Sequence, residues 1–484
     1  MEQNLKEQTI KEKYAYWEWR TLILLMIGYA LFYFVRKNFS IVMPALEAEL
    51  GISKTRLGLF LTLNGIIYGV SRFINGFLAD RVSRRKMMAT GLLLSAVVNL
   101  FIGLSPEMDG LFHFLDAEGK ATMGLVVFIG SLWLINGYTQ GMGYPPCGAL
   151  MAQWIKPSEL ALKQSVWNSS HSIGAGLVAL LCGTVILKFF GYESWQWCFY
   201  IPAILAIFGA AMLFFGLRDD PASVGLPDPE QLDEHLAGKE VESESKEFKD
   251  LAYKRLVGPM VFQNRYVWIL ALTNVFVYVI RFTILDWGST FLTQYKGLPI
   301  SKASVVVALS EIAGGIIGTL LAGFATDKFF KGKSHQTCFI GLLGATIMFA
   351  LFWMMPKERN GLGVFCIIMA SFFVYMPQAL IGVAASNQST KRVAASSNGV
   401  MGIFAYAATV ISGVVFGALA DSAGGWDAVF RVAIIMGCIG SVIIATMWKA
   451  PANGYEKANR ILDEVRVEYA ALQAGSKDKP VAHE

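Results

Sequence analysis

Twelve long apolar runs, separated by short polar segments, make up most of the chain. A helix needs about 20 apolar residues to cross the hydrocarbon core of a membrane, and each run is near or above that length. Several runs contain glycine, which membrane helices tolerate where two helices approach closely. The pattern therefore predicts an all-α integral membrane protein with twelve transmembrane helices. The expected spans lie near residues 21–44, 57–79, 87–105, 122–150, 165–190, 195–217, 266–293, 302–326, 336–355, 362–384, 395–420 and 428–448.

The composition agrees with a membrane protein. Hydrophobic residues make up 55% of the 484-residue chain and charged residues only 16%, whereas soluble domains are about one quarter charged. The net charge of +5 is small for this length, so we do not expect a nucleic-acid partner. The six cysteines lie in or beside apolar runs, without a CxxC pair, and no nucleophile–base set stands out. We expect no metal site, no cofactor and no enzymatic activity.

Basic residues in the short loops predict the orientation of the chain in the membrane. The segment 80–86 carries four basic residues and the segment 327–333 carries three, whereas the loops on the opposite side are poorer in basic residues or contain acidic ones. The first apolar run also lacks a small-residue cleavage site, so we interpret it as a true first helix. The protein is expected in a plasma membrane, of the bacterial inner-membrane type, with both termini in the cytoplasm.

One long polar stretch divides the chain into two halves. It begins with Arg218-Asp219-Asp220-Pro221 and includes a glutamate-rich run, so we interpret it as a solvated cytoplasmic linker. The predicted organisation is an N-terminal six-helix half (1–217), the linker (218–260), a C-terminal six-helix half (261–450) and a polar cytoplasmic tail (451–484). A surface helix is possible within the tail.

The two halves repeat each other. Residues 64–81 align without a gap on residues 311–328, and Gly76-x-x-x-Asp80 recurs there as Gly323-x-x-x-Asp327. Two six-helix units in the same orientation form parallel halves related by an axis along the membrane normal. A substrate then binds between the halves near the midplane, and access alternates by rocking.

Two arginines lie deep inside apolar runs. Arg36 follows Tyr33 and Arg281 follows Tyr278 in the same Tyr-x-x-Arg pattern, at matching positions of the two halves. A charge inside hydrocarbon costs roughly 2.5–3.5 kcal/mol on insertion scales. Snorkelling to a membrane surface fits poorly, because a full helical stretch precedes each arginine. A guanidinium meets phosphate oxygens bidentately, so the pair predicts a phosphate-binding site between the halves, with the adjacent Lys37 as a further candidate.

Other polar residues inside the apolar runs could complete this site. His171 could donate to a phosphate and sense its protonation, although a lone buried histidine is often only hydrogen-bonded. Arg72 could face the site or snorkel, and its half-equivalent Thr319 gives it no support from symmetry. Glu311 should pair with a cation, because an unpaired carboxylate there is costly, and Asp286 is a second candidate for such pairing.

Four tyrosines could lend hydroxyl groups to a substrate, with packing as an equally good explanation for each. They are Tyr29, Tyr68, Tyr375 and Tyr406.

The glycine–aspartate segments resemble the loop motif of the major facilitator superfamily. This resemblance implies a conformational role for Asp80 and Asp327, each beside a helix end, in latching the cytoplasmic side in one state. The gating candidates are Asp80, Arg81, Arg85, Asp327, Lys328, Glu311 and Asp286.

Four segments resemble the organophosphate:phosphate antiporter family of that superfamily: 28–39, 141–148, the Trp167-Asn-x-x-His171 motif, and 274–287. The resemblance spans about residues 17–449. It implies exchange of an organic phosphate for inorganic phosphate by a monomer in the lipid bilayer. The paired arginines of the family match Arg36 and Arg281, its helix-five histidine matches His171, and its helix-two lysine falls at Arg72, which keeps the charge but changes its shape. Its cavity tyrosines fall at the four positions named above.

The organic part of the substrate and the use of the site stay open. Glycerol-3-phosphate and sugar phosphates such as glucose-6-phosphate are the candidates, and Asn398 and Met401 disfavour one hexose-phosphate subtype. One alternative is a sugar-phosphate sensor that signals to a partner kinase. The other is a proton-coupled symporter for an organic anion, for which Glu311 is the fair candidate for the titrating group.

Overall fold

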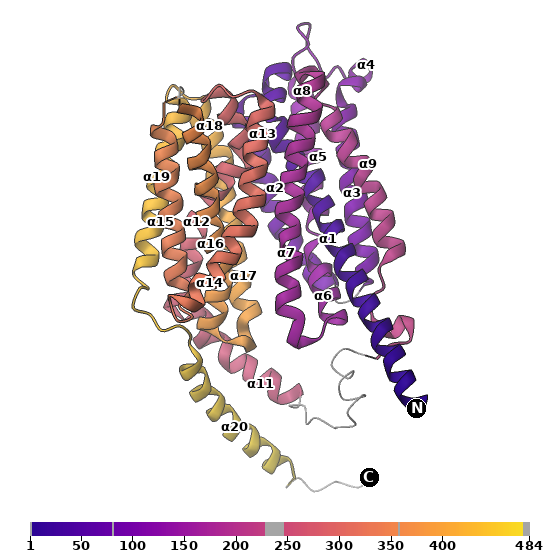
Figure 1. Ribbon diagram of the computed structural model, residues 1–484, viewed down its shortest axis with the longest axis vertical. Coiled ribbons are helices and arrows are strands. Elements are labelled where there is room, and N and C mark those ends of the chain that lie inside the picture. The colour runs from indigo at the N-terminus through magenta and orange to yellow at the C-terminus, as the bar shows by residue number, and fades with distance from the viewer. Residues whose placement is uncertain (1, 80–81, 228–245, 357–358, 478–484) are drawn as a thin grey trace.

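The computed structural model describes residues 2–79, 82–227, 246–356 and 359–477. Within these ranges, twelve helices are long and apolar enough to cross a membrane, from Ile10–Leu50 to Gly425–Ala445. Figure 1 shows them running side by side along the long axis of the molecule. The predicted all-α membrane fold is therefore confirmed.

The first six spans include two breaks that divide a span into shorter helices. They are α1 (Glu2–Leu50), α2 (Lys54–Ala79), α3 (Arg84–Leu104), α5 (Met123–Gln140) with α6 (Tyr144–Trp154), α7 (Pro157–Ala179) with the π-helix η2 (Leu180–Ile186) and α8 (Leu187–Phe190), and α9 (Trp197–Gly216). The expected span 122–150 is thus two helices, because the chain turns at 141–143 and the following prolines 145 and 146 cannot donate helical hydrogen bonds.

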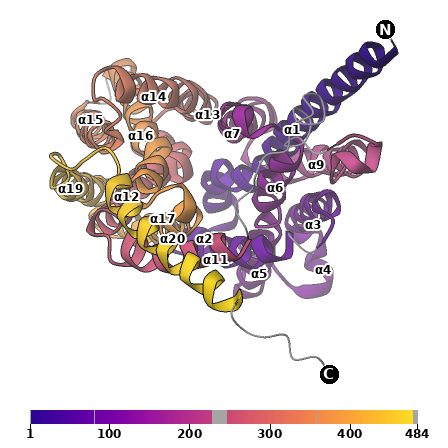
Figure 2. The ribbon, with the colours of Figure 1, turned by 90° about the horizontal axis from the view of Figure 1, so that it is seen from below.

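The last six spans contain two more π-helical segments. They are α12 (Arg265–Gln294), α13 (Ile300–Leu309) with η6 (Ser310–Gly318) and α14 (Thr319–Lys328), α15 (Ser334–Met354), α16 (Asn360–Ser389), α17 (Ala394–Val410) with η9 (Ile411–Val415) and α18 (Phe416–Asp421), and α19 (Gly425–Ala445). Viewed from below, the first six spans group on one side and the last six on the other (Figure 2).

Two further helices lie at the end of the molecule that carries the termini (Figure 1). They are α11 (Lys246–Val257) in the linker and α20 (Tyr455–Lys477) in the tail. They pack through the buried side chains of Phe248, Ala252 and Val465, and Arg255 forms a 2.8 Å ion pair with Glu468. The linker is therefore not polar coil throughout, because apolar residues spaced three and four apart give α11 a face to bury. Residues 228–245 lie outside the described ranges.

The two halves meet closely at the end far from the termini, which we call the outer end; the opposite end is the inner end. A Cβ atom added to Gly58 of α2 would lie 2.4 Å from the carbonyl oxygen of Gly413 in η9. A Cβ atom added to Gly183 of η2 would similarly overlap the side chain of Ser304 in α13. By contrast, a Cβ atom at Gly76 or Gly323, near the inner ends of α2 and α14, would meet no described atom within 4 Å.

Candidate functional site

Arg36 lies on α1 in the middle of the molecule, partly exposed. Its guanidinium carbon is 5.3 Å from the ring centre of Tyr33 and 4.3 Å from that of Tyr68 on α2. Both distances fall within the range of cation–π contacts, which attract a guanidinium without neutralising it. Among the described residues Arg36 has no ion-pair partner, so its charge is available to an anion.

Arg281 is buried on α12 and contacts a tyrosine and a carboxylate in series. Its Nη2 donates to the hydroxyl of Tyr375 over 3.4 Å, and that hydroxyl donates to Oε2 of Glu311 in a short hydrogen bond. The pairing expected for Glu311 therefore runs through Tyr375 rather than by direct contact with a cation. Because the 3.4 Å hydrogen bond is long and Nε of Arg281 has no partner among the described residues, the guanidinium keeps donors for a ligand.

His171 on α7 lies beside the two tyrosines that contact the arginines, Tyr33 and Tyr375. Its ring centre is 5.7 Å from that of Tyr33, which Arg36 contacts, and 6.3 Å from that of Tyr375, which Arg281 contacts. Its Nδ1 is 3.0 Å from the hydroxyl of Ser172, whereas Nε2 is buried without a partner in the part of the chain that the structure describes. The structure thus brings together Arg36, Arg281 and His171, with an unsatisfied histidine nitrogen among them.

A second layer of aromatic residues lies nearer the inner end in the N-terminal half. The guanidinium of Arg72 covers the ring of Tyr144 at 3.7 Å, and Tyr144 packs against Tyr29 and Trp167. Trp167 is four residues, about 6 Å along the helix, before His171. Arg72 and Tyr29 were predicted from the sequence as site residues. Tyr144 was not, since the two prolines that follow it are typical of a turn.

Tyr406 on α17 joins this layer from the other half. Its ring centre is 5.1 Å from that of Tyr68, so all four candidate tyrosines lie around the arginines. Their roles toward a substrate stay predictions.

Lys37 and Asp286 form a buried ion pair between the halves. Nζ of Lys37 is 2.5 Å from Oδ1 of Asp286, and the two side chains are only 9% and 11% exposed. Ser40 also donates to this carboxylate, over 3.3 Å. Asp286 thus pairs with the lysine of the opposite half and not with Arg281 on its own helix. The ammonium group of Lys37, expected to contact substrate, is occupied by Asp286 in this structure.

The charges around the site leave an excess of positive charge. In the described part of the chain, four cations (Arg36, Lys37, Arg72 and Arg281) face two carboxylates (Asp286 and Glu311). An excess of two positive charges in a site of low dielectric favours a dianion. A phosphate monoester is such a dianion near neutral pH.

The gating candidates at the inner end are only partly described. Asp80 and Arg81 lie outside the described residues, and Asp327 and Lys328 are exposed at the end of α14. The backbone nitrogen of Arg85 donates to Asp219 over 2.8 Å, and Ser83 donates to the same carboxylate over 2.5 Å. Asp219, which the sequence reasoning placed in the linker, therefore caps the first turn of α3.

Three buried asparagines near Arg36 were also missed from the sequence. Asn99 of α3 and Asn136 of α5 both donate to the carbonyl oxygen of Val35, each over 3.0 Å. Asn38 donates to Oδ1 of Asn99 over 2.8 Å. Asn99 interrupts an apolar run as a single polar residue, and Asn38 and Asn136 lie among other polar residues, so the sequence did not single them out.

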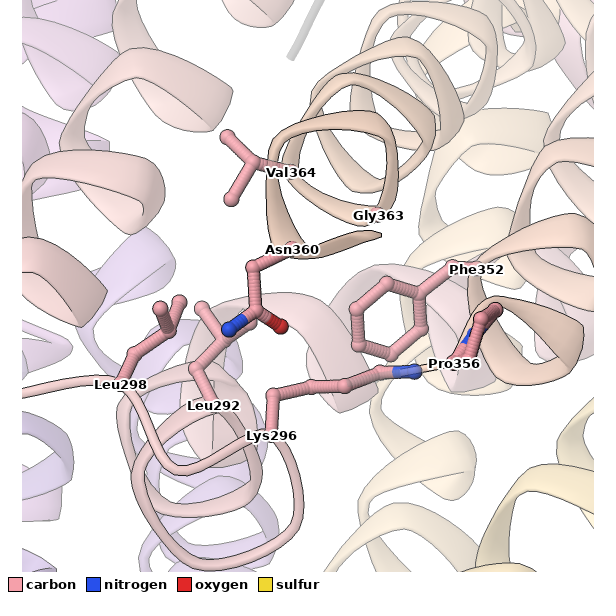
Figure 3. Close-up of a pocket in the computed structure, with 8 residues that line it drawn as sticks. All are labelled: Leu292, Lys296, Leu298, Phe352, Pro356, Asn360, Gly363 and Val364. Atoms are coloured by element: carbon pink, nitrogen blue, oxygen red, sulfur yellow. The ribbon is translucent and has the colours of Figure 1, made fainter. Parts of the chain in front are cut away.

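A small pocket in the C-terminal half, too narrow to be a substrate cavity, lies apart from these residues (Figure 3). Lys296 extends across it and donates to the carbonyl oxygen of Met355 over 2.6 Å, and Asn360 lines the same pocket. The residues that line it come from one half only, so it does not offer the shared site predicted by the repeat. Nor do the described residues contain a group of three or more metal-ligating side chains.

Comparison with known sequences gives matches along almost the whole chain. The sequence matches the profile of the Major Facilitator Superfamily over residues 25–413. It is 33% identical to a probable hexose phosphate transport protein of Chlamydia pneumoniae, over 92% of this chain and 94% of that protein. It is 34% identical to the glycerol-3-phosphate transporter of Bacillus subtilis, over 89% and 92%, and 31% identical to the membrane sensor protein UhpC of Escherichia coli, over 90% and 93%.

Comparison with solved structures gives the same fold. A bacterial homologue of the human lysosomal transporter Spinster, inward-facing and unoccupied, matches with a TM-score of 0.67 at 14% identity, over 93% of this chain and 98% of that one. The inward-open xylose transporter XylE from E. coli matches with a TM-score of 0.66 at 16% identity, over 90% and 96%. At these identities the likeness concerns the fold alone.

Proposed function

We propose, because the chain belongs to the Major Facilitator Superfamily, that it exchanges a small organophosphate for inorganic phosphate across a membrane. The observation that carries this proposal is that Arg36 and Arg281, from opposite halves, each contact a tyrosine that packs against His171. Neither guanidinium forms an ion pair with a described residue, so both positive charges are available to bind an anion.

The phosphate group is expected to bridge the two halves. Arg36 approaches it from α1 and Arg281 from α12, and His171 donates from Nε2 when it carries a proton there. Because the bound dianion offsets the repulsion between the two guanidiniums, it lowers the cost of bringing the halves together. Organic and inorganic phosphate compete for this one site, which couples the two fluxes.

The organic part of the substrate is proposed to be glycerol or a sugar. Relatives named for hexose phosphate and for glycerol-3-phosphate transport support this range. Arg72 and the aromatic layer around Tyr144 lie about one helical turn from the phosphate-binding residues, and so can contact hydroxyl groups. We further propose a monomer in a plasma membrane with both termini in the cytoplasm.

Reconstituted vesicles test the exchange directly. Vesicles loaded with inorganic phosphate should take up labelled glycerol-3-phosphate or glucose-6-phosphate, whereas vesicles loaded with sulfate should not. Uptake that does not depend on internal phosphate would refute antiport. A panel of phosphate esters in the same vesicles identifies the preferred organic part.

The outer end must open once in each transport cycle. At this end Thr62 of α2 accepts from the backbone nitrogen of Val414 and donates to the carbonyl oxygen of Thr409, over 2.9 and 2.8 Å. Asp421 accepts from the backbone and hydroxyl of Thr55, each over 2.7 Å, at the first turn of α2. These contacts join opposite halves, and we propose that they hold the outer end closed.

Thr62→Val is therefore expected to favour outer opening. Valine keeps the shape but removes both hydrogen bonds, which shifts the equilibrium about tenfold. Hydrogen–deuterium exchange should rise about tenfold in residues 54–66 and 409–417, and fall at the inner end. Thr62→Ser, which keeps the hydroxyl, is the matched control. A rise confined to the outer end would indicate local loosening instead.

A proton-coupled symporter is the main competing mechanism, since Glu311 is a buried carboxylate joined to Arg281 through Tyr375. Under antiport, Glu311→Gln should retain phosphate exchange in vesicles without a pH gradient, because glutamine can still accept from Tyr375. Loss of transport with intact phosphate binding would favour the symporter.

A sensor is the second competing function, supported by the likeness to a membrane sensor protein. It would use the same pocket with little flux. A stable complex with a kinase, together with negligible exchange in the vesicles, would establish it.

A further inference from the structure

The helix that carries Arg36 is broken at the residue before it. Val35 has φ −94° and ψ 16°, whereas an α-helical residue has ψ near −42°. This rotation turns the peptide that joins Val35 to Arg36 away from helical geometry. The bend therefore sets the direction in which Arg36 leaves the backbone.

Two buried side-chain amides hold the bend. The carbonyl oxygen of Val35 accepts from Nδ2 of Asn99 and from Nδ2 of Asn136, both over 3.0 Å. Both asparagines are fully buried, one on α3 and one on α5. A carbonyl oxygen has two lone pairs, so the two amides together satisfy it.

The helical segment after the bend is fixed by hydrogen bonds on the side opposite Arg36. Asn38 donates to Oδ1 of Asn99 over 2.8 Å and to the carbonyl oxygen of Cys198 on α9 over 3.0 Å. Residues two apart on a helix point to nearly opposite sides. Asn38 therefore anchors one side of α1 to α3 and α9, while Arg36 points from the opposite side toward the centre of the molecule.

These asparagines are poor choices for stability alone. Oδ1 of Asn38 and Oδ1 of Asn136 have no hydrogen-bond partner in the described structure, and a buried unpaired acceptor is unfavourable. Residues that break a local rule in this way are expected at functional sites. The bend also belongs to one arginine only, since α12 carries Arg281 on a single α-helix over Arg265–Gln294.

We infer that Asn99 and Asn136 are positioning residues for phosphate binding, acting through the bend at Val35 to aim the guanidinium of Arg36. Neither amide contacts the ligand, and the effect of each passes through Arg36. This inference rests on the proposed function, because it assumes that Arg36 binds phosphate.

A double-mutant cycle tests the inference with the full-length protein in detergent and inorganic phosphate as the probe, measured by titration calorimetry. Asn136→Leu should weaken phosphate binding about tenfold in the wild type. In an Arg36→Lys background the same change should weaken it less than about twofold, because contacts that act through one residue are not additive. A purely structural role would give the same factor in both backgrounds and would overturn the inference.

Asn274→Leu is the matched control. Asn274 is also a buried asparagine whose amide donates to a backbone carbonyl, that of Met401 over 2.9 Å, and whose Oδ1 has no partner. Its effect should be the same with and without Arg36→Lys. If Asn136→Leu does not fold, as judged by thermal unfolding, Asn136→Ala replaces it. Wild-type protein that does not bind phosphate would overturn the proposed function itself, which separates the two failures.

Discussion

Arg36→Lys and Arg281→Lys are each expected to lower phosphate exchange about a hundredfold. Lysine keeps the positive charge but replaces the planar fork with a single ammonium group, so one of two charge-assisted hydrogen bonds to phosphate is lost and the other is misplaced. Hydrogen bonds to charged groups contribute roughly 1.5–3 kcal/mol each, and about 2.7 kcal/mol corresponds to a hundredfold. Initial exchange rates in vesicles over a range of phosphate concentrations measure the effect as a change in kcat/KM.

Arg265→Lys is the control for this pair. Arg265 begins the same helix sixteen residues before Arg281 and is exposed, so its replacement should leave exchange near the wild-type rate. Full activity in Arg36→Lys or in Arg281→Lys would refute bidentate binding of phosphate by that arginine. A loss in only one of the two would show that the halves do not share the phosphate.

Asp286→Leu is expected to be the most destabilising single change near the site. It leaves Lys37 buried and unpaired between the halves, and breaking a buried ion pair by removing one partner costs about 3–5 kcal/mol. The midpoint of thermal unfolding in detergent should therefore fall by several degrees. Lys37→Met combined with Asp286→Leu should recover most of the loss, because two well-packed apolar residues can replace a buried pair.

The exposed pair between Arg255 and Glu468 provides the comparison for this effect. Its side chains are 58% and 38% exposed, and exposed pairs contribute little to stability. Glu468→Leu should leave the unfolding midpoint within about one degree of the wild type. If Lys37→Met with Asp286→Leu is no more stable than Asp286→Leu alone, the charge-pair explanation is wrong.

Much of the fold follows from the sequence because the membrane imposes one length and one backbone geometry on every span. The apolar runs therefore predicted twelve helices. The breaks inside them were not predictable from hydropathy. The turn at 141–143 leaves an apolar run intact, although the prolines that follow it mark the break. The π-helical η9 also leaves its run intact and differs from a continuous α-helix only in its local hydrogen bonding.

The internal repeat is the sequence feature that predicted the pair of arginines. The repeat placed Arg36 and Arg281 at equivalent positions, and each contacts a tyrosine that packs against His171. Their role in binding stays a prediction. Interaction partners that do not follow the repeat were not predictable from the sequence. Asp286 lies five residues after Arg281 and invites a pairing on its own helix, but its partner is Lys37 in the opposite half.

The asparagines around Val35 illustrate a second limit on predicting a site from its sequence. A single amide inside an apolar run is compatible with many roles, and its partner here is a backbone carbonyl on another helix. Backbone acceptors have no signature in a sequence, because every residue has one. Only the bend in α1 reveals which carbonyl needs a donor.

The empty space around Gly76 and Gly323 has a consequence for the whole cycle. At the outer end, glycines such as Gly58 are pressed against the opposite half, whereas these two motif glycines have no described atom within 4 Å of an added Cβ. In this conformation no described neighbour requires a glycine at either position. We expect their small size to matter when the inner ends approach each other, as the proposed rocking requires. A small residue that has no close neighbour in one conformation therefore indicates where two helices are expected to come into contact in the other conformation.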